Sequence, residues 1–424
     1  MKTIIIIILG ISLQINLFGQ DDIVFVWDKD ASSISNAQNL LSIHRIIYEF
    51  QNKNIKSKYW EENNWKKKSL GIGYRFAKTI LLDYQIDYLV HLHQHEIFGH
   101  GYRYREFEYE DNSFNINIAP PYGNGGGFAR RGSPNYNRQL GKHEEIMIRS
   151  GGMEAAAILS KNLRRRWLIN GEINYRESLL YLSTLHDYSA YIYGTKLFNS
   201  DEPGNDVNNY LRTVNSSYGY TSEDSYKLTL DDISKRTTVN LINTFQLFAV
   251  YSYLKEYLFC GEESFKYPMI KLGRTNWLPS IRFGLTPFGS EFIVENFLKT
   301  ETSILGIDLR LGDNKLDKFW GGGLSYYRVI SNNIQIGSYG NFWIQPPMEL
   351  GGITRFNTKE GFGGRLVGEI NFHLNNSFPI GIYSQIGYKS TGFIEGERLD
   401  KGLIMRVGIS IKKEHSTEHS IHGK

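Results

Sequence analysis

The sequence predicts an α+β protein with a mainly helical N-terminal part, followed by an antiparallel, β-rich C-terminal part. Residues 34–260 contain long stretches with the apolar spacing of helices, whereas from about residue 277 apolar residues recur at every second position. Aromatic residues make up 14% of the chain and there are 42 glycines. Such a composition is typical of β-structure with many turns, or of a surface in contact with lipid.

The first twenty residues (1–20) have the features of a secretory signal peptide. Lys2 supplies a positive charge, residues 4–13 form an apolar core too short to cross a bilayer, and Gly19 lies near a plausible cleavage point. This pattern resembles signals of Gram-negative bacteria, so we expect an exported protein of the periplasm or outer membrane. Cys260 is the single cysteine, so no intramolecular disulfide is expected, and we interpret it as structural.

The charge balance gives no indication of nucleic-acid binding. The chain has 48 basic and 44 acidic residues and a net charge of +4, which is too small and too evenly mixed to indicate such a partner. Two short basic runs, at 66–68 and 164–166, are interpreted as solvated faces of helices.

Residues 21–275 are predicted to form the helical domain. Four stretches have helical spacing or composition, and the last of them opens with acidic residues suited to a helix N-terminus. That stretch also contains Asn, Gln, Lys and Glu, so we expect a packed amphipathic helix and not a membrane span. The four stretches are 36–50, 74–100, 144–163 and 231–259.

Residues 276–413 are predicted to form the β-rich part, and residues 414–424 a flexible tail. The alternation of apolar and polar residues between 279 and 413 defines about eight strand candidates, several about ten residues long. This pattern of alternating strands resembles that of the β-barrels of bacterial outer membranes, and the resemblance implies contact with the outer membrane. A soluble antiparallel sheet, sandwich or barrel is the alternative interpretation.

The segment HLHQHEIFGHGYR (91–103) is the strongest candidate for a metal site. Zinc hydrolases commonly carry His-Glu-x-x-His on a helix, where the histidines bind zinc and the glutamate accepts a proton from water. Here the spacing is one residue longer, from His95 and Glu96 to His100. On a regular helix such a spacing would separate the two rings, so we expect a one-residue bulge, with Gly99 best able to take the distortion.

The motif His-Glu-x-x-Gly-His resembles the signature motif of the dipeptidyl peptidase III family of zinc peptidases. In that family the third ligand is a Glu in a Glu-x-x-Ala context on a later helix, and Glu154 in GGMEAAAIL matches it. The resemblance is confined to these two short patches. It implies that His95, His100 and Glu154 bind zinc and that Glu96 is the general base. Gly151, Gly152 and the following alanines would let the second helix pack closely against the first.

Other ligand sets remain open from the residues alone. His91 and His95 have i, i+4 spacing and need no bulge, while His91, His93 and His95 would share one face of a strand. His91 and His93 are also interpreted as supporting or packing residues. Further third-ligand candidates are Glu144 and Glu145, and candidates for transition-state contacts are Tyr102, Arg103 and His186.

The glycine-rich loop 116–134 lies between the two predicted zinc helices. It is interpreted as a mobile lid or cleft wall, with Phe114, Ile116 and Ile118 in an edge strand for an extended peptide, or else as an ordinary loop. Together these features predict an exported zinc metallopeptidase, acting on a peptide or protein substrate and tied to the outer membrane. The alternatives are an outer-membrane β-barrel with a channel, assembly or scaffold role and a structural histidine cluster, or a soluble periplasmic peptidase.

Overall fold

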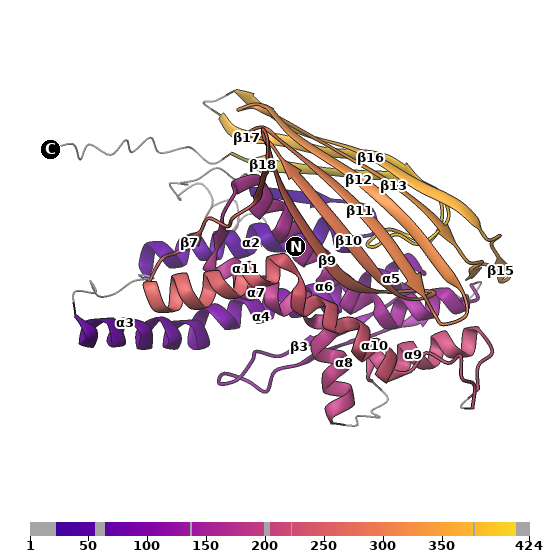
Figure 1. Cartoon of the computed structure of the whole chain (residues 1–424). Helices are drawn as coiled ribbons and strands as arrows, with labels where there is room; N and C mark the ends of the chain where they lie inside the picture. Colours follow the sequence, from indigo (N-terminus) through magenta and orange to yellow (C-terminus); the bar gives the residue numbers. More distant parts are fainter. Residues whose placement is uncertain are drawn as a thin grey trace.

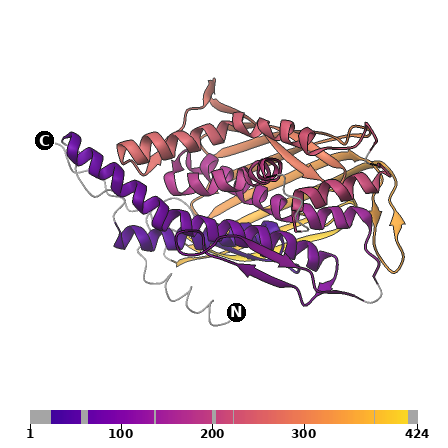
Figure 2. The ribbon, with the colours of Figure 1, turned by 90° about the horizontal axis from the view of Figure 1, so that it is seen from below.

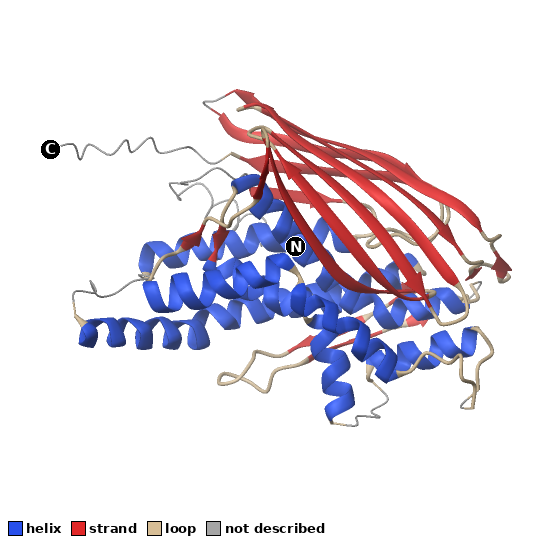
Figure 3. Ribbon diagram, in the orientation of Figure 1, coloured by secondary structure: helices blue, strands red, loops and turns tan. Residues whose placement is uncertain are grey.

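A computed structural model describes residues 23–55, 64–135, 138–198, 204–221, 223–375 and 378–412. A helical layer lies against one large twisted sheet (Figure 1). Helices and strands are segregated on the two sides of the molecule (Figure 3), and this confirms the predicted α+β class. The predicted signal peptide and the tail 414–424 lie outside the described residues. Within the described ranges, none of the helices combines the length and apolar character needed to cross a membrane.

The helical layer is built around α6 (Lys142–Asn170), most of whose residues are buried. The long segment 74–100 is helical throughout, but two π-helical stretches interrupt it. The other elements of this layer are α2 (Ser33–Asn54), α3 (Trp65–Lys78), η1 (Thr79–Asp83), α4 (Tyr84–Leu92), η2 (His93–His100), α5 (Gly101–Glu106), α7 (Tyr175–Leu185), α8 (Asp187–Leu197), α9 (Asp206–Ser217), α10 (Leu230–Thr237), η3 (Thr238–Ile242), α11 (Thr244–Tyr251) and η4 (Ser252–Cys260).

In the described part of the chain, the main sheet has ten strands, and all neighbouring pairs are antiparallel. Eight are ten residues or longer and correspond to the predicted β-rich part. In spatial order the strands are β1 (Ile23–Trp27), β18 (Gly402–Ile411), β17 (Phe378–Lys389), β16 (Gly361–Asn375), β13 (Ile334–Gln345), β12 (Lys318–Ser331), β11 (Ser303–Asp313), β10 (Gly289–Lys299), β9 (Thr275–Thr286) and β8 (Ile270–Leu272).

Two strands of this sheet come from outside residues 276–413. Strand β1 pairs with the last strand, β18, and β8 pairs with the start of β9. Four short two-stranded sheets complete the fold, and the one that concerns the candidate site is β3 (Ser113–Ile116) with β4 (Gly127–Arg130). The others pair β2 (Tyr109–Glu110) with β5 (Ser133–Pro134), β6 (Ile173–Asn174) with β7 (Ser264–Phe265), and β14 (Glu349–Leu350) with β15 (Phe356–Asn357).

The face of the sheet that covers the helices is polar, which is the reverse of a usual sheet packed on a core. Arg164 of α6 pairs with Glu295 of β10, and Arg165 pairs with Glu369 of β16. The interpretation of run 164–166 as a solvated face is therefore wrong, since Arg164 is only 1% exposed. These arginines are retained in the interior because each finds a carboxylate there.

The helical layer itself has an ordinary apolar core. One cluster packs α2, α6, α7 and α11 together around Trp167, Tyr181 and Phe245. A second cluster joins α6, α8 and α9 through Ile146, Met153 and Tyr210. Viewed from the helical side, the helices lie in front of the strands (Figure 2). The core therefore fixes the relative positions of the helices that carry the histidine cluster.

Candidate metal centre

The π-helical stretch η2 brings His95 and His100 to one side of the helix. Its backbone bonds span five residues, as shown by the amide of Gly101, which donates to the carbonyl of Glu96. Residues five apart therefore lie above one another, and the two imidazole centroids are 5.1 Å apart. The expected distortion is present, and it extends over eight residues instead of a single bulge.

Asp206, at the start of α9, lies against these two rings. Its Oδ2 atom is 3.0 Å from Nε2 of His100 and 3.5 Å from Nε2 of His95. The preceding residue, Asn205, caps the helix by accepting a hydrogen bond from the amide of Asn208, so the Asp206 carboxylate is not needed as the cap. His95, His100 and Asp206 each offer one atom that could bind a metal ion, and these three atoms lie within 4.8 Å of one another.

The other ring nitrogen of each histidine is held by a hydrogen-bond acceptor. Nδ1 of His100 is 2.8 Å from the carbonyl oxygen of Ile148, and Nδ1 of His95 is 2.9 Å from Oδ2 of Asp187. Because these partners only accept, both Nδ1 atoms carry the proton, and in a neutral ring each Nε2 is a lone pair. Two lone pairs then face the Asp206 carboxylate, and either a second proton on the rings or a bound cation compensates these three acceptors.

Gly152 of α6 lies directly beside the two Nε2 atoms. A Cβ atom at this position would be 2.3 Å from Nε2 of His95 and 2.7 Å from Nε2 of His100. A Cβ on Gly99 would in turn be 2.6 Å from the carbonyl oxygen of Gly151. The expected close packing of the two helices is confirmed, and the missing side chain of Gly152 keeps the space at the imidazoles open.

The electrostatics of the cluster favour positive charge. Burial alone would lower the pKa of His95, but the carboxylates of Asp187, Asp206 and Glu96 together outweigh burial and hold that pKa well above its usual value. For His100, Asp206 likewise overcomes the effect of burial and raises the pKa. Burial would raise the pKa of both aspartates, yet the histidines hold each pKa well below its usual range. Anionic carboxylates at a buried histidine pair fit a divalent cation.

Glu154, the third ligand implied by the family resemblance, does not join this group. Nη2 of Arg103 donates to Oε1 of Glu154 over 2.6 Å, and the amide of Gly396 donates to the same oxygen over 2.7 Å. Arg103 also pairs with Glu106. Among the described residues, the structure places Asp206 beside the histidines, whereas the Glu154 carboxylate contacts Arg103 directly in a buried ion pair.

Tyr102 and Arg103, predicted as transition-state contacts, are 1% and 0% exposed. The guanidinium of Arg103 is held in its ion pair with Glu154. Glu144 and Glu145 are engaged elsewhere: Glu144 accepts from the amide of Gly141 and pairs with Arg138, and Glu145 pairs with Arg131 and Arg149.

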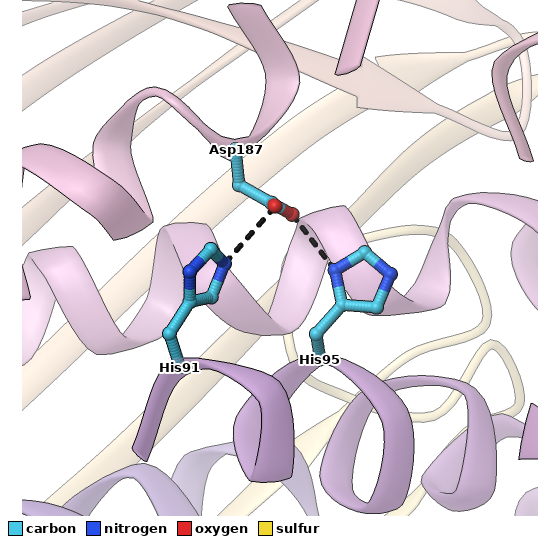
Figure 4. Close-up of side chains that lie close together, drawn as sticks. All are labelled: His91, His95 and Asp187. Atoms are coloured by element: carbon cyan, nitrogen blue, oxygen red, sulfur yellow. Dashed lines mark hydrogen bonds and ion pairs between the residues drawn. The ribbon is translucent and has the colours of Figure 1, made fainter. Parts of the chain in front are cut away.

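A second group consists of His91, His95 and Asp187 (Figure 4). The Asp187 carboxylate lies between the rings, 3.0 Å from Nε2 of His91 and 2.9 Å from Nδ1 of His95. Here donors face an acceptor, so two neutral histidines satisfy one carboxylate without an ion. We therefore regard this group as the support that orients His95, in agreement with the supporting role expected for His91.

The remaining predicted histidines are placed away from the centre. Nδ1 of His93 lies 2.7 Å from the carbonyl oxygen of Leu89 on its own helix. The side chain of His186 interacts with Gln246, while its neighbour Asp187 is the residue that enters the site. The sequence analysis singled out His186, whereas the structure places the adjacent Asp187 beside His91 and His95. Asp206 was missed because a helix-starting aspartate is common for reasons of capping alone.

Glu96 is buried beside the hairpin of β3 and β4. A Cβ atom on Gly127 would be 3.4 Å from Oε1 of Glu96, so the hairpin passes directly over this carboxylate. The charge of Glu96 acts on both His95 and His100. Tyr191 of α8 also borders the site: its ring centroid is 6.3 Å from that of His95, and its hydroxyl oxygen accepts from the amide of Asp206 at 3.5 Å.

Comparisons with known proteins add no relative. No protein-family model, curated protein or solved structure matches this chain.

Proposed function

We propose that the protein is a zinc-dependent hydrolase, and that His95, His100 and Asp206 hold the ion. The observation that carries this proposal is the convergence of two Nε2 atoms and one carboxylate oxygen, with both Nδ1 protons already committed to acceptors. Imidazole and carboxylate ligands suit zinc. Three protein ligands are the number found in catalytic zinc sites, which keep a further position for water or substrate.

The chemistry proposed is hydrolysis of a peptide bond, with Glu96 as general base. Bound zinc would lower the pKa of a water molecule and polarise the carbonyl group of the substrate. Glu96 follows His95 directly and its charge reaches both ligand histidines, so its carboxylate can take a proton from the attacking water. The water oxygen bonds to the carbonyl carbon, the C–N bond breaks, and Glu96 returns the proton to the leaving amine.

Two further features support a peptide substrate. The hydroxyl oxygen of Tyr191 accepts from a backbone amide, so its proton is free to be donated to the oxygen on which negative charge develops. The β3–β4 hairpin beside Glu96 has two strands only, and the outer edge of such a pair can hold an extended peptide. The proximity of this hairpin, which includes part of the loop 116–134, to Glu96 supports its proposed role as a lid or cleft wall.

The test is metal content and peptide hydrolysis, measured on the same preparations. We expect about one zinc per chain in the wild type and in Glu154→Gln, but little in Asp206→Asn. The Glu96→Gln variant should keep its zinc while cleavage of a fluorogenic peptide library falls by about 10²–10⁴-fold. Zinc bound equally by Asp206→Asn would contradict the ligand set. Zinc without any cleavage would favour a structural metal in a scaffold protein.

A further inference from the structure

The outer face of the main sheet is apolar and has no helix over it. Along β16 the outward side chains include Phe362, Leu366 and Ile370, of which Phe362 is 76% and Leu366 is 68% exposed. The intervening residues Arg365 and Glu369 point inward to ion pairs. The alternation found in the sequence is therefore real, but the polar residues face the protein interior.

The same inversion extends across β11, β12, β13, β17 and β18. Paired outward positions on neighbouring strands are mostly apolar, apart from Ser338 and Ser384, and on β16, β17 and β18 these outward positions contain no charged side chain. The large exposed apolar residues of this face are Ile307, Leu309, Leu311, Trp320, Leu324, Phe342, Phe362, Leu366, Ile370, Phe372, Leu374, Ile382, Ile386, Tyr388, Leu403, Met405, Val407 and Ile409. An unbroken patch of this extent is not stable in contact with water alone.

The dimensions of this patch match the hydrocarbon region of a bilayer. Outward side chains on β16 run from Phe362 to Leu374, a length of about 40 Å at about 3.3 Å per residue. A strand tilted by about 45° would cover about 28 Å of depth with that length, close to the hydrocarbon thickness of about 30 Å.

The margins of the patch also match a bilayer. Trp320, Phe342 and Phe362 form an aromatic row near one end of the strands, with ring centroids 5.8 and 6.4 Å apart. Lys318 begins β12 on that side, two residues before Trp320, and Arg328 lies toward the other end of the same strand. At the boundary between hydrocarbon and headgroups, aromatic side chains are expected at the edge of the apolar region and charged side chains beyond them.

We propose that the outer face of β11–β13 and β16–β18 is a lipid-contacting surface whose partner is the hydrocarbon region of a phospholipid bilayer. A second copy of the chain is the competing occupant, but contact between two copies would not require an apolar depth close to the hydrocarbon thickness with an aromatic row at its margin. The edge of β9 is also blocked to strand pairing with another chain, because Asn240 and Asn243 bond to the backbone of Phe283 and Ile281. This inference does not depend on the metal site.

The test uses the mature chain, purified in mild detergent, and flotation with phosphatidylcholine vesicles after removal of the detergent. The test variant carries Leu366→Asp, Ile386→Asp and Leu403→Asp, three exposed positions on neighbouring strands. The matched control carries Tyr122→Asp, Leu197→Asp and Tyr226→Asp, equally exposed positions of the helical side. Because none of the six side chains is buried, the folded state should survive, and circular dichroism checks this.

Wild type and control should float with the vesicles, with and without a zinc chelator, whereas the test variant should lose about tenfold or more of the vesicle-bound fraction. A wild type that stays in solution would overturn the proposal. Light scattering then identifies the true occupant: a stable wild-type dimer that the test variant reduces to monomer would assign the face to a second copy. Equal flotation of wild type and test variant would also overturn it, because other residues would then bind the lipid.

Discussion

Two buried clusters of charged residues lie one helical turn apart and have opposite characters. In the first, Arg103 supplies donors to Glu154 and Glu106, and the amide of Gly396 adds another. In the second, the Nε2 atoms of His95 and His100 face the Asp206 carboxylate, and the proton of each ring has been used at Nδ1. The first cluster has a permanent positive charge in Arg103, whereas in the second the positive charge comes from protonated histidines or from a bound cation.

This difference separates an ion pair that stabilises the fold from a site that binds a metal. Both clusters are buried, and both combine residues that look like ligands in a sequence. What distinguishes them is whether each acceptor meets a donor. A carboxylate that meets an arginine is satisfied by fixed donors, while the Asp206 carboxylate is satisfied only by a second proton on the imidazoles or by a cation in place of that proton.

The largest expected effect is on the cluster around Arg103. Arg103→Ala would leave Glu154 and Glu106 buried without their main donor, so the free energy of unfolding should fall by about 3–5 kcal/mol. Urea denaturation monitored by circular dichroism, in the presence and absence of a chelator, measures this change. An unchanged midpoint would show that the pair contributes nothing to the fold.

The next effect is on the histidine cluster. Gly152→Ala places a methyl group against both Nε2 atoms, so zinc affinity should fall by about a hundredfold or more. Competition with a chromophoric chelator gives the affinity. Gly194→Ala is the matched control, since a Cβ there meets no atom within 4 Å. Equal affinities of the two variants would mean that the ion does not lie beside Gly152.

A smaller effect is expected from the residue that orients His95. Asp187→Asn keeps an oxygen that can accept from Nδ1 of His95 but removes the negative charge. Zinc affinity should therefore fall by about 10–100-fold, with the fold intact. The same competition assay measures it, and a loss of zinc as complete as in Asp206→Asn would make Asp187 a ligand instead.

The smallest effect is expected at the surface of α6. Arg131 pairs with Glu145, and both side chains are partly exposed to solvent. Arg131→Ala should lower the free energy of unfolding by about 0.2–1 kcal/mol, because water screens such a pair. Urea denaturation under the conditions used for Arg103→Ala measures the difference. A loss as large as that of Arg103→Ala would remove burial as the explanation for the difference between the pairs.

The sequence predicted the fold class and the positions of the long elements because both depend on local periodicity. The change from a helical period to a period of two near residue 277 corresponds to the start of β9 at Thr275. It did not predict β1, whose five residues become a strand only by pairing with β18, almost four hundred residues later. Nor does alternation tell which face of a strand is buried. The helical run 164–166 was misinterpreted because its carboxylate partners Glu295 and Glu369 lie on the polar inner face of the sheet.

Part of the candidate site was predictable because it depends on the spacing of residues that are close in sequence. His95, Glu96 and His100 are close in sequence, and the helical distortion followed from their spacing. The third partner depends on which helix packs across η2. Glu154 and Asp206 both lie on helices near η2, and only the three-dimensional packing directs Arg103 to the first and the histidines to the second.

The donors to the Arg103 cluster come from the connection between the last two long strands. The amides of Gly396 and Leu399 donate to Glu154 and Glu106, and the carbonyl of Glu397 accepts from Arg103. The helices behind the histidines therefore lack these partners until synthesis has passed residue 399. A nascent or C-terminally truncated chain would hold buried carboxylates without them, so completion of the centre is tied to completion of the whole polypeptide.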